Sequence, residues 1–477
     1  MRNMSLPDWV QKYKTKGVEI RKRGKRYHAY RITSKWNPKK KRSQKITLEY
    51  LGVVTPSGIT KPRKRGFLKG DYEYGHINFM WKLTKESGLL SAIKECYPYK
   101  WEEIISFAFL RLIQPLPLKS IHHLYDKTYL SKLFQNTAMS PKALSGLLLY
   151  LGENFTLRDR LMKKLTQKGK YIIIDLTALF SYSQNIALLE KSYNKDHLSL
   201  PQINLLLLFA SDMKLPTYVR LLPGTVRDVS TIKNTIKMAK LENVFFIADR
   251  GFFSDDNVKD LRKEAISYVI PLKRNSTLIP KLLQNKFEGV FTYNDRPIIY
   301  WKKKKRSNFL YIFEDKDLKK DEETTFLIAV EDGRKNQEMY FNEQRKFGKL
   351  FLLSDVDDNP EVIYKLYKDR EQIEYAFNVF KNLLEADKSY LQETAKFEGY
   401  IFLNLFSLYI YYLILNKLKY CDLNKKCSVK DLILQLSKVK VYDFEGEELL
   451  SEVPKQVRLL SEKLELDFDL LRIKWRS

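Results

Sequence analysis

Cysteine is scarce in this chain, which carries only Cys96, Cys421 and Cys427 among its 477 residues. No CxxC pair occurs, and no cysteines and histidines cluster at the spacing of a metal site. The sequence therefore supports neither a disulfide framework nor a zinc site. Scarce cysteine also fits a reducing, intracellular setting.

The N-terminus lacks the apolar segment of a secretory signal, so we expect none. The most apolar stretch, residues 401–415, contains Asn404 and is short for a membrane span. We therefore expect a buried core helix there and no membrane partner. Internal repeats and low-complexity tracts are also absent.

Acidic residues are few in the first 70 positions, where 21 Lys and Arg residues face only Asp8, Glu19 and Glu49. This region has a net charge of +18, out of +28 for the whole chain. A protein this basic is expected to bind nucleic acid. Hydrophobic residues make up 44% of the sequence, which is typical of a folded protein. The length predicts about two to four domains.

The first third of the chain changes from β-like to helical patterns. Segments 26–36 and 43–54 are β-like and lie on either side of Asn37-Pro38 and a lysine run, which predicts a turn between two strands. Residues 75–168 are predicted to be helical. One of these helices should begin after Ser140, a plausible N-cap before a proline.

From residue 170 onward, apolar runs indicate three consecutive strands, followed by helix, strand, helix and strand. Continuous apolar runs are typical of a mixed sheet covered by helices, so we expect an α/β fold. Short β-like pieces in 275–350, the last of them 324–332, indicate an inserted β-rich segment. One more strand, a long helix over 359–384, a buried helix over 395–420 and a helical remainder complete the prediction.

Two aspartates are predicted to lie at the C-terminal ends of apolar strands, Asp175 and Asp249. That edge of an open α/β sheet is where ligands bind, and a carboxylate beside a buried strand is costly unless it is paired or metal-bound. Together with Glu374 they could supply three hard oxygen ligands for Mg²⁺ or Mn²⁺. The alternative for each aspartate is a helix cap or an ion-pair partner.

One segment, YKDREQIEYAFNVFK, places Tyr367, Arg370, Glu374 and Lys381 on one side of a helix. At roughly 100° per residue they fall within a stripe about 60° wide. The stripe joins a carboxylate, an aromatic hydroxyl and two cations, as an active-site helix would. The alternative is a surface helix in which Arg370 and Glu374 form an ordinary i, i+4 ion pair.

An apolar seam lies beside this stripe and could dock on a sheet. Its members are Leu366, Ile373, Phe377, Phe380 and Leu384.

These motifs resemble those of insertion-sequence transposases of the DDE type, in the insertion sequence 4-like superfamily and its 1634-like branch. The strand around Asp175 resembles the first-aspartate strand of that family, and IADRGF resembles its second-aspartate motif. The stripe matches the full YREK signature. The resemblance spans roughly residues 10–420, although DRGFFS replaces the DREA form of some relatives.

The resemblance implies a ribonuclease H-like fold in which Asp175, Asp249 and Glu374 bind two Mg²⁺ or Mn²⁺ ions. Tyr367, Arg370 and Lys381 would hold the DNA backbone, as would Arg250 beside the second aspartate. The partners implied are terminal inverted repeats, target DNA and a second copy of the chain. The setting implied is the nucleoid in a prokaryotic cytoplasm.

The domains expected on this basis are a basic N-terminal DNA-binding unit with its linker (1–70), a helical DNA-binding region (71–168), a ribonuclease H-like catalytic core (169–274 and 351–420), a β-rich insertion (275–350) and a helical C-terminal region (421–477).

Trp301, followed by the basic run 302–306, is a further candidate DNA contact, because an aromatic ring with neighbouring cations can stack on a base. Its alternative is a strand aromatic beside a solvated charged edge.

The function expected is metal-dependent cleavage at the ends of an insertion sequence, followed by transfer of the 3′-OH into target DNA. Two alternatives stay open: a transposase-derived DNA-binding protein, and a metal-dependent nuclease without strand transfer.

Overall fold

The computed structural model describes residues 6–24, 26–38, 41–60, 67–180, 183, 185–190, 201–225, 244–247, 255–279, 286–387, 391–444 and 447–468. Contacts divide the chain into two units, one of residues 1–70 with 443–448 and one of residues 71–442 with 449–477. Each unit is described by itself below.

The first unit is a four-stranded antiparallel sheet with one short helix. Its elements are α1 (Asp8–Gln11), β1 (Val18–Arg23), β2 (Arg26–Asn37), β3 (Arg42–Thr55) and β4 (Gly58–Thr60), with the strands in sequence order. A small core of Val10, Ala29 and Val54 holds it together. The two strands predicted on either side of Asn37-Pro38 are confirmed as β2 and β3.

Helices predominate between residues 75 and 166, as predicted. The main ones are α2 (Gly75–Glu86), α3 (Leu89–Cys96), α4 (Trp101–Ile113), α5 (Ile121–Lys127), α6 (Leu130–Leu133), α7 (Pro141–Glu153) and α8 (Phe155–Thr166). The Ser140 hydroxyl caps α7 by accepting from the Ala143 backbone N–H at 3.3 Å, so the predicted N-cap is confirmed.

The second unit contains a nine-stranded mixed sheet in the order β11-β12-β13-β14-β10-β9-β6-β7-β8. The pairs β6–β9 and β9–β10 are parallel, and every other neighbouring pair for which a register is described is antiparallel. This arrangement confirms the predicted mixed α/β fold. The strands are β6 (Ile172–Phe180), β7 (Gln202–Ala210), β8 (Leu215–Pro223), β9 (Val244–Ile247), β10 (Ser267–Pro271), β11 (Gly289–Tyr293), β12 (Arg296–Lys305), β13 (Asn308–Asp315) and β14 (Lys349–Ser354).

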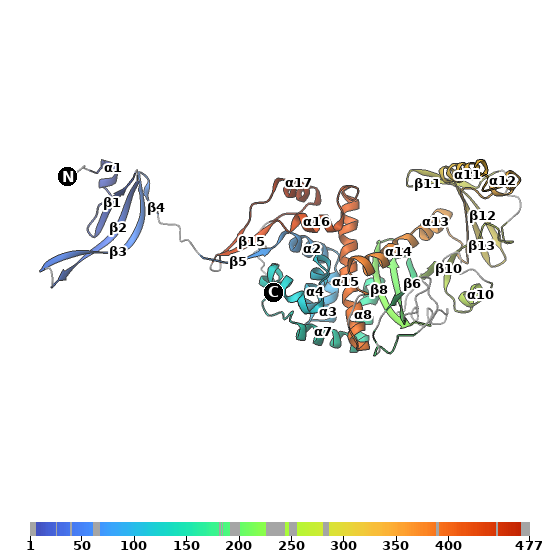
Figure 1. The fold of residues 1–477 in the computed structure, drawn as a ribbon, viewed down its shortest axis with the longest axis horizontal. Helices are drawn as coiled ribbons and strands as arrows, with labels where there is room; N and C mark the ends of the chain where they lie inside the picture. Colours follow the sequence, from blue (N-terminus) through green and yellow to red (C-terminus); the bar gives the residue numbers. More distant parts are fainter. Residues whose placement is uncertain are drawn as a thin grey trace. The chain divides into compact units, whose positions relative to one another are not determined.

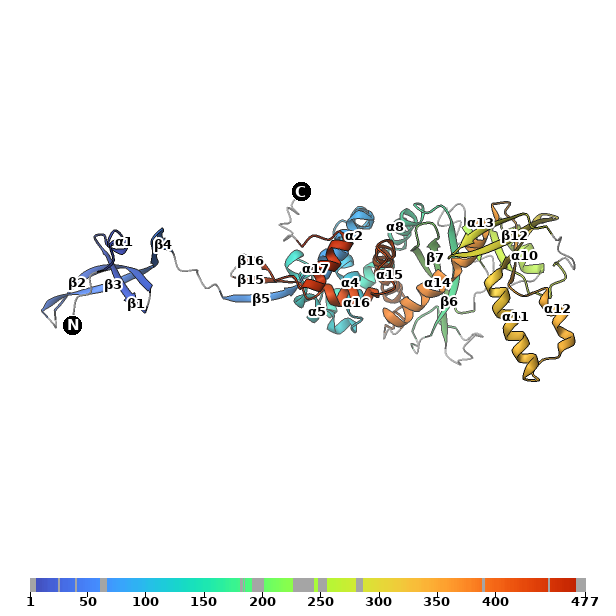
Figure 2. The same ribbon diagram turned by 90° about the horizontal axis from the view of Figure 1, so that it is seen from above.

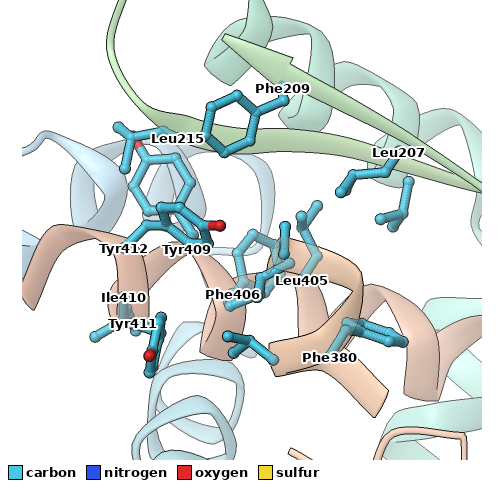
Figure 3. Close-up of a cluster of buried hydrophobic side chains, with 14 of the residues drawn as sticks. Leu207, Phe209, Leu215, Phe380, Leu405, Phe406, Tyr409, Ile410, Tyr411 and Tyr412 are labelled. Atoms are coloured by element: carbon cyan, nitrogen blue, oxygen red, sulfur yellow. The ribbon is translucent and has the colours of Figure 1, made fainter. Parts of the chain in front are cut away.

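The long helix α15 (Thr394–Tyr420) lies between this sheet and the helical region, in contact with β8 on one side and with α4 and α7 on the other (Figure 1). Figure 3 shows its aromatic residues, among them Phe406 and Tyr412, facing Phe209 of β7. Among the described residues it is the one single helix long and apolar enough to cross a membrane, yet 78% of its most apolar window is buried inside the protein. The predicted buried helix is therefore confirmed.

The segment 275–350 contains both strands and helices. Strands β11 to β13 extend the central sheet, and α11 (Lys316–Glu331) and α12 (Tyr340–Gln344) follow them, projecting from the end of that sheet in Figure 2. The strand predicted over 324–332 is wrong, because these residues belong mostly to α11. Asp315 caps this helix by accepting from the Asp317 and Leu318 backbone N–H groups at 3.0 Å.

The C-terminal region is helical in α16 (Val429–Leu436) and α17 (Lys455–Leu464), but two short strands separate these helices. Strands β15 (Lys440–Phe444) and β16 (Glu447–Leu450) form a three-stranded sheet with β5 (Leu68–Glu73). The prediction of an entirely helical remainder is wrong here, because burial alternates along β15 with the period of a strand.

Helix α10 (Asp255–Lys263) contacts β10. Three helical segments, which contact β10, β6 or α15, carry the candidate site. These are α13 (Pro360–Lys368), α14 (Arg370–Asn378) and the π-helical turn η3 (Val379–Leu383).

Candidate active site

Asp175 lies on β6 at the point where the pairing of this strand with β9 ends. Residues 172–174 pair in parallel with 244–246 and are fully buried, whereas Asp175 is half-buried and accepts from the Leu176 backbone N–H at 2.9 Å. On its other edge β6 remains paired with β7 as far as Phe180. The prediction that the strand ends at Asp175 is therefore wrong for the β7 edge and holds only for the β9 edge.

The second aspartate motif lies outside the described residues. Strand β9 is described as far as Ile247, two positions before Asp249 in the sequence. Asp249 and Arg250 thus keep the status of predictions.

The sequence predicted one long helix over 359–384, and this prediction is wrong in detail. The segment consists of α13, α14 and η3 in succession. The division between α13 and α14 is at Asp369, which is 8% exposed. Its carboxylate accepts hydrogen bonds from the Ser211 hydroxyl and the Lys214 ammonium, in the turn between β7 and β8. A buried carboxylate requires such partners, so this contact fixes the segment against the sheet.

The apolar seam predicted beside the stripe is confirmed, since each member is 7% exposed or less. The buried residues are Leu366, Ile373, Phe377, Phe380 and Leu384.

Within the stripe, the structure brings Arg370 and Glu374 together in an ion pair of 2.6 Å. The Glu374 side chain is 53% exposed and that of Arg370 is 18% exposed. Tyr367 is half-buried and packs against the main core. The i, i+4 pair of the alternative interpretation is thus present, and it leaves the carboxylate of Glu374 accessible to solvent.

Lys381, the last residue of the stripe, connects η3 to β6. Its ammonium donates to the Thr177 hydroxyl at 2.8 Å and to the Ala178 carbonyl at 2.7 Å. Thr177 lies two residues after Asp175 on the same strand, and α14 also contacts β6. The strand that carries Asp175 and the helix that carries Glu374 are therefore neighbouring elements, although the two residues are about 200 positions apart in the sequence.

Arg111 of α4 is a residue that sequence reasoning missed. It is 3% exposed and donates to the Leu384 carbonyl at the end of η3, and also to the Tyr400 hydroxyl of α15 at 3.0 Å. Burial lowers the pKa of Arg111. The signal that could have identified Arg111 is a single cation within the otherwise apolar C-terminal end of α4, because a buried charge needs hydrogen-bond or ion-pair partners.

Trp301 lies on β12 and is 5% exposed. Its indole N–H donates to the Lys286 carbonyl at 3.1 Å. A stacking surface for a base has to be exposed, so this burial fits the strand aromatic of the alternative interpretation and not the predicted DNA contact. Two lysines of the following run are also engaged, Lys302 with Asp357 and Lys305 with the Leu278 carbonyl.

Within the described part of the chain, no three His, Cys, Asp or Glu side chains gather as a metal site would require. Asp175 and Glu374 supply two carboxylates on neighbouring elements, and the third predicted ligand, Asp249, is outside the described residues. Carboxylate oxygens are the donors that Mg²⁺ and Mn²⁺ prefer, so the donor set fits such ions.

Comparisons with known proteins give a family-model match and a similarity to a solved structure. No curated protein matches the chain. A solved structure of the piggyBac transposase in a synaptic complex with hairpin DNA is similar at 15% identity and a TM-score of 0.35, covering 71% of this chain and 70% of that chain. The family model of the transposase DDE domain matches residues 166–410, more than half of the sequence. This chain therefore belongs to the transposase DDE domain family.

Proposed function

We propose that this transposase cleaves DNA at the ends of an insertion sequence and transfers the resulting 3′-OH into target DNA. The observation that carries the proposal is the contact of Lys381 with Thr177 and Ala178. This contact holds the YREK helix against the strand of the first aspartate, which is what a shared active site of Asp175 and Glu374 requires.

The strand order supports a ribonuclease H-like core for this site. Within β8-β7-β6-β9-β10, the first three strands are antiparallel and consecutive in the chain, and the last two continue in parallel. Because the stripe residues match the YREK signature, we assign the chain to the 1634-like branch of the insertion sequence 4-like superfamily.

Asp175, Asp249 and Glu374 would hold two Mg²⁺ or Mn²⁺ ions. When bound, such ions activate the attacking oxygen and stabilise the leaving oxygen of a phosphodiester. The half-buried position of Asp175 and the exposed carboxylate of Glu374 suit this role, since one ligand is fixed by the sheet and the other is open to the substrate.

The cations of the stripe would hold the DNA backbone near the cleaved bond. Arg370 can bind a phosphate with two parallel hydrogen bonds, and in the absence of DNA it neutralises Glu374. Lys381 supplies a point charge beside β6, and Tyr367 can donate its hydroxyl. Arg250 is a further candidate next to Asp249.

The substrates proposed are terminal inverted repeats and target DNA, bound mainly through phosphates by the basic N-terminal unit and the helical region. Two ends have to be joined in one complex, so we propose a homodimer on DNA. The proposed setting is the nucleoid of a prokaryotic cytoplasm.

A nicking and strand-transfer assay tests the proposal, with Mg²⁺ and duplexes taken from the inverted repeats that flank the gene. Asp175→Ala and Glu374→Ala should each lower both activities by at least about a hundredfold, because the carboxylates act as a unit. Glu371→Ala is the matched control for Glu374→Ala, since Glu371 lies on the same helix and is 69% exposed. This control should keep activity near that of the wild type.

The products separate the proposal from its alternatives. Joined strands indicate a transposase, free ends alone indicate a nuclease, and duplex binding without cleavage indicates a DNA-binding protein. Undiminished cleavage by Asp175→Ala would overturn the assignment of the site.

A further inference from the structure

Strands β2 and β3 continue as a two-stranded ribbon beyond the core of the N-terminal unit. Strand β1 pairs with β2 only as far as Arg31, and β4 pairs with β3 only at residues 53–55. Beyond these limits, six pairs run from Ile32 with Thr47 to Asn37 with Arg42. At about 3.4 Å per residue the ribbon extends roughly 20 Å.

The ribbon is basic and solvent-exposed, and the rest of the N-terminal unit does not cover it. Residues 32–47 include six Lys and Arg and no Asp or Glu. Residues 42–47 of β3 are all exposed, and Trp36 and Ile46 are 62% and 40% exposed. A few lysines suffice to protect an edge strand from aggregation, but they do not account for exposed apolar side chains on a strand pair of this length.

The two faces of the ribbon differ in what lies beside them. Directly paired residues of an antiparallel ribbon share a face. One face, which we call the Glu19 face, is approached by β1: Lys45 lies 3.5 Å from the Glu19 carboxylate, and Arg21 donates to the Thr47 hydroxyl at 3.0 Å. Its ribbon residues are Ile32, Ser34, Trp36, Ser43, Lys45 and Thr47.

The opposite face, which we call the open face, presents long polar side chains in adjacent pairs. Lys35 pairs with Gln44 and Asn37 with Arg42, and the Asn37 amide donates to the Gln44 side-chain oxygen at 3.0 Å. This bond spans two successive pairs and shows that their side chains lie together. Thr33 and Ile46 complete the face.

We propose that the ribbon enters the major groove of duplex DNA with its open face toward the bases. The major groove, about 12 Å wide, admits a two-stranded ribbon. Arg and Lys recognise guanine edges, Asn and Gln recognise adenine edges, and methyl groups contact thymine, which are the side-chain types that this face carries. The proposal rests on the proposed function and adds to it the element that reads the sequence of the DNA ends.

Charge selects the open face over the Glu19 face. The groove is lined by phosphates on both sides, so a carboxylate near the bases would be repelled. Glu19 is 29% exposed beside Lys45, and hydrogen bonding to Arg21 holds the pKa of Glu19 below its usual range, so this carboxylate is ionised at neutral pH. The ribbon residues of the open face include two cations and no acidic residue. The next acidic residue toward the core, Glu49, forms an ion pair with its strand partner Arg31 at 3.7 Å.

Selection from a randomised duplex library with the full-length protein tests the proposal. The wild type should enrich a sequence motif. Lys35→Ala/Gln44→Ala should lose the preference at one or two of its positions and bind the selected duplex about tenfold to a hundredfold more weakly. Ser43→Ala/Lys45→Ala, which removes the same charge from the Glu19 face, should enrich the wild-type motif with an affinity change of only a few-fold.

The outcomes are separable from those of the cleavage assay. An unchanged motif and affinity in Lys35→Ala/Gln44→Ala, or an equal loss in both double variants, would overturn the reading role of the open face. So would a wild type that enriches no motif. In any of these cases the wild type can still nick and join terminal-repeat DNA, whereas absence of that activity alongside a ribbon-dependent motif would refute the proposed function only.

Discussion

Two charged side chains inside apolar elements of this protein are bound by polar partners. Asp369 is bound by Ser211 and Lys214, and Arg111 by backbone and hydroxyl oxygens. His76 of α2 differs, because it is fully buried and neither ring nitrogen has a hydrogen-bond partner among the described residues. Burial lowers the pKa of His76 to about 3.

His76 should make the protein sensitive to mild acid. Below its ordinary pKa of about 6.5, the unfolded chain binds a proton that the folded chain does not bind until about pH 3. The free energy of unfolding should therefore fall by about 2 kcal/mol between pH 7 and 5 from this residue alone. Thermal unfolding of His76→Leu should show a smaller loss of melting temperature over that range than the wild type.

His123→Leu is the control, because His123 is exposed on α5. The Glu73 carboxylate lies 3.8 Å from His76 Nε2, and burial raises the pKa of Glu73. A carboxyl whose pKa is raised by folding stabilises the fold as the pH falls, so Glu73 acts against the loss caused by His76. Equal acid sensitivity in the wild type and His76→Leu would contradict the prediction.

At the scale of elements, the crossing of α7 and α15 depends on glycine. A Cβ at Gly399 would lie 2.1 Å from the Leu148 carbonyl oxygen, and one at Gly152 would lie 1.7 Å from the Ala395 carbonyl oxygen. The two helices therefore approach closely enough to touch through their backbones. This contact joins the helical region to the helix that supports the central sheet.

Gly399→Ala should destabilise the protein by about 1–3 kcal/mol, since the backbone of α7 would have to move. This loss should occur although alanine is the better helix former by about 1 kcal/mol. Gly146→Ala in the same helix pair is the control, because no atom beyond the adjoining residues and backbone of its own helix lies within 4 Å of the added Cβ. It should leave stability unchanged or raise it, as measured by urea unfolding. Similar losses in both variants would exclude a role for the crossing.

At the scale of the whole molecule, the net charge of +28 is concentrated in residues 1–70. Phosphate contacts should therefore dominate non-specific DNA binding. With six or more such contacts, affinity should fall by about 10³-fold or more between roughly 50 and 200 mM salt.

Removal of residues 1–66, which retains β5, should make the logarithm of affinity depend less steeply on the logarithm of salt concentration. Fluorescence anisotropy with a random-sequence duplex measures both slopes. Equal slopes would show that the phosphate contacts lie elsewhere in the chain. Near-native thermal unfolding of the remainder would verify that the deletion removed charge and not the fold.

Much of the fold could be predicted because it depends on local patterns. The apolar runs of β6 to β8, the cap at Ser140 and the apolar seam are each readable from neighbouring residues. Dependence on local patterns also explains the wrong strand prediction over 324–332, because the β-branched and aromatic residues of this segment suit a strand locally. The cap at Asp315 and the burial of Phe326 and Ala329 at helical spacing decided otherwise.

The sequence by itself determined the basic N-terminal charge, the order of the DDE motifs and the stripe of the YREK residues, because these depend on residue type and spacing. Only the tertiary structure decided that Lys381 binds β6, that Asp369 divides the helix, that Trp301 is buried and that the ribbon has one open face. These features depend on strand register and on contacts between distant segments. Local periodicity shows which face of an element is apolar, but not which element covers it.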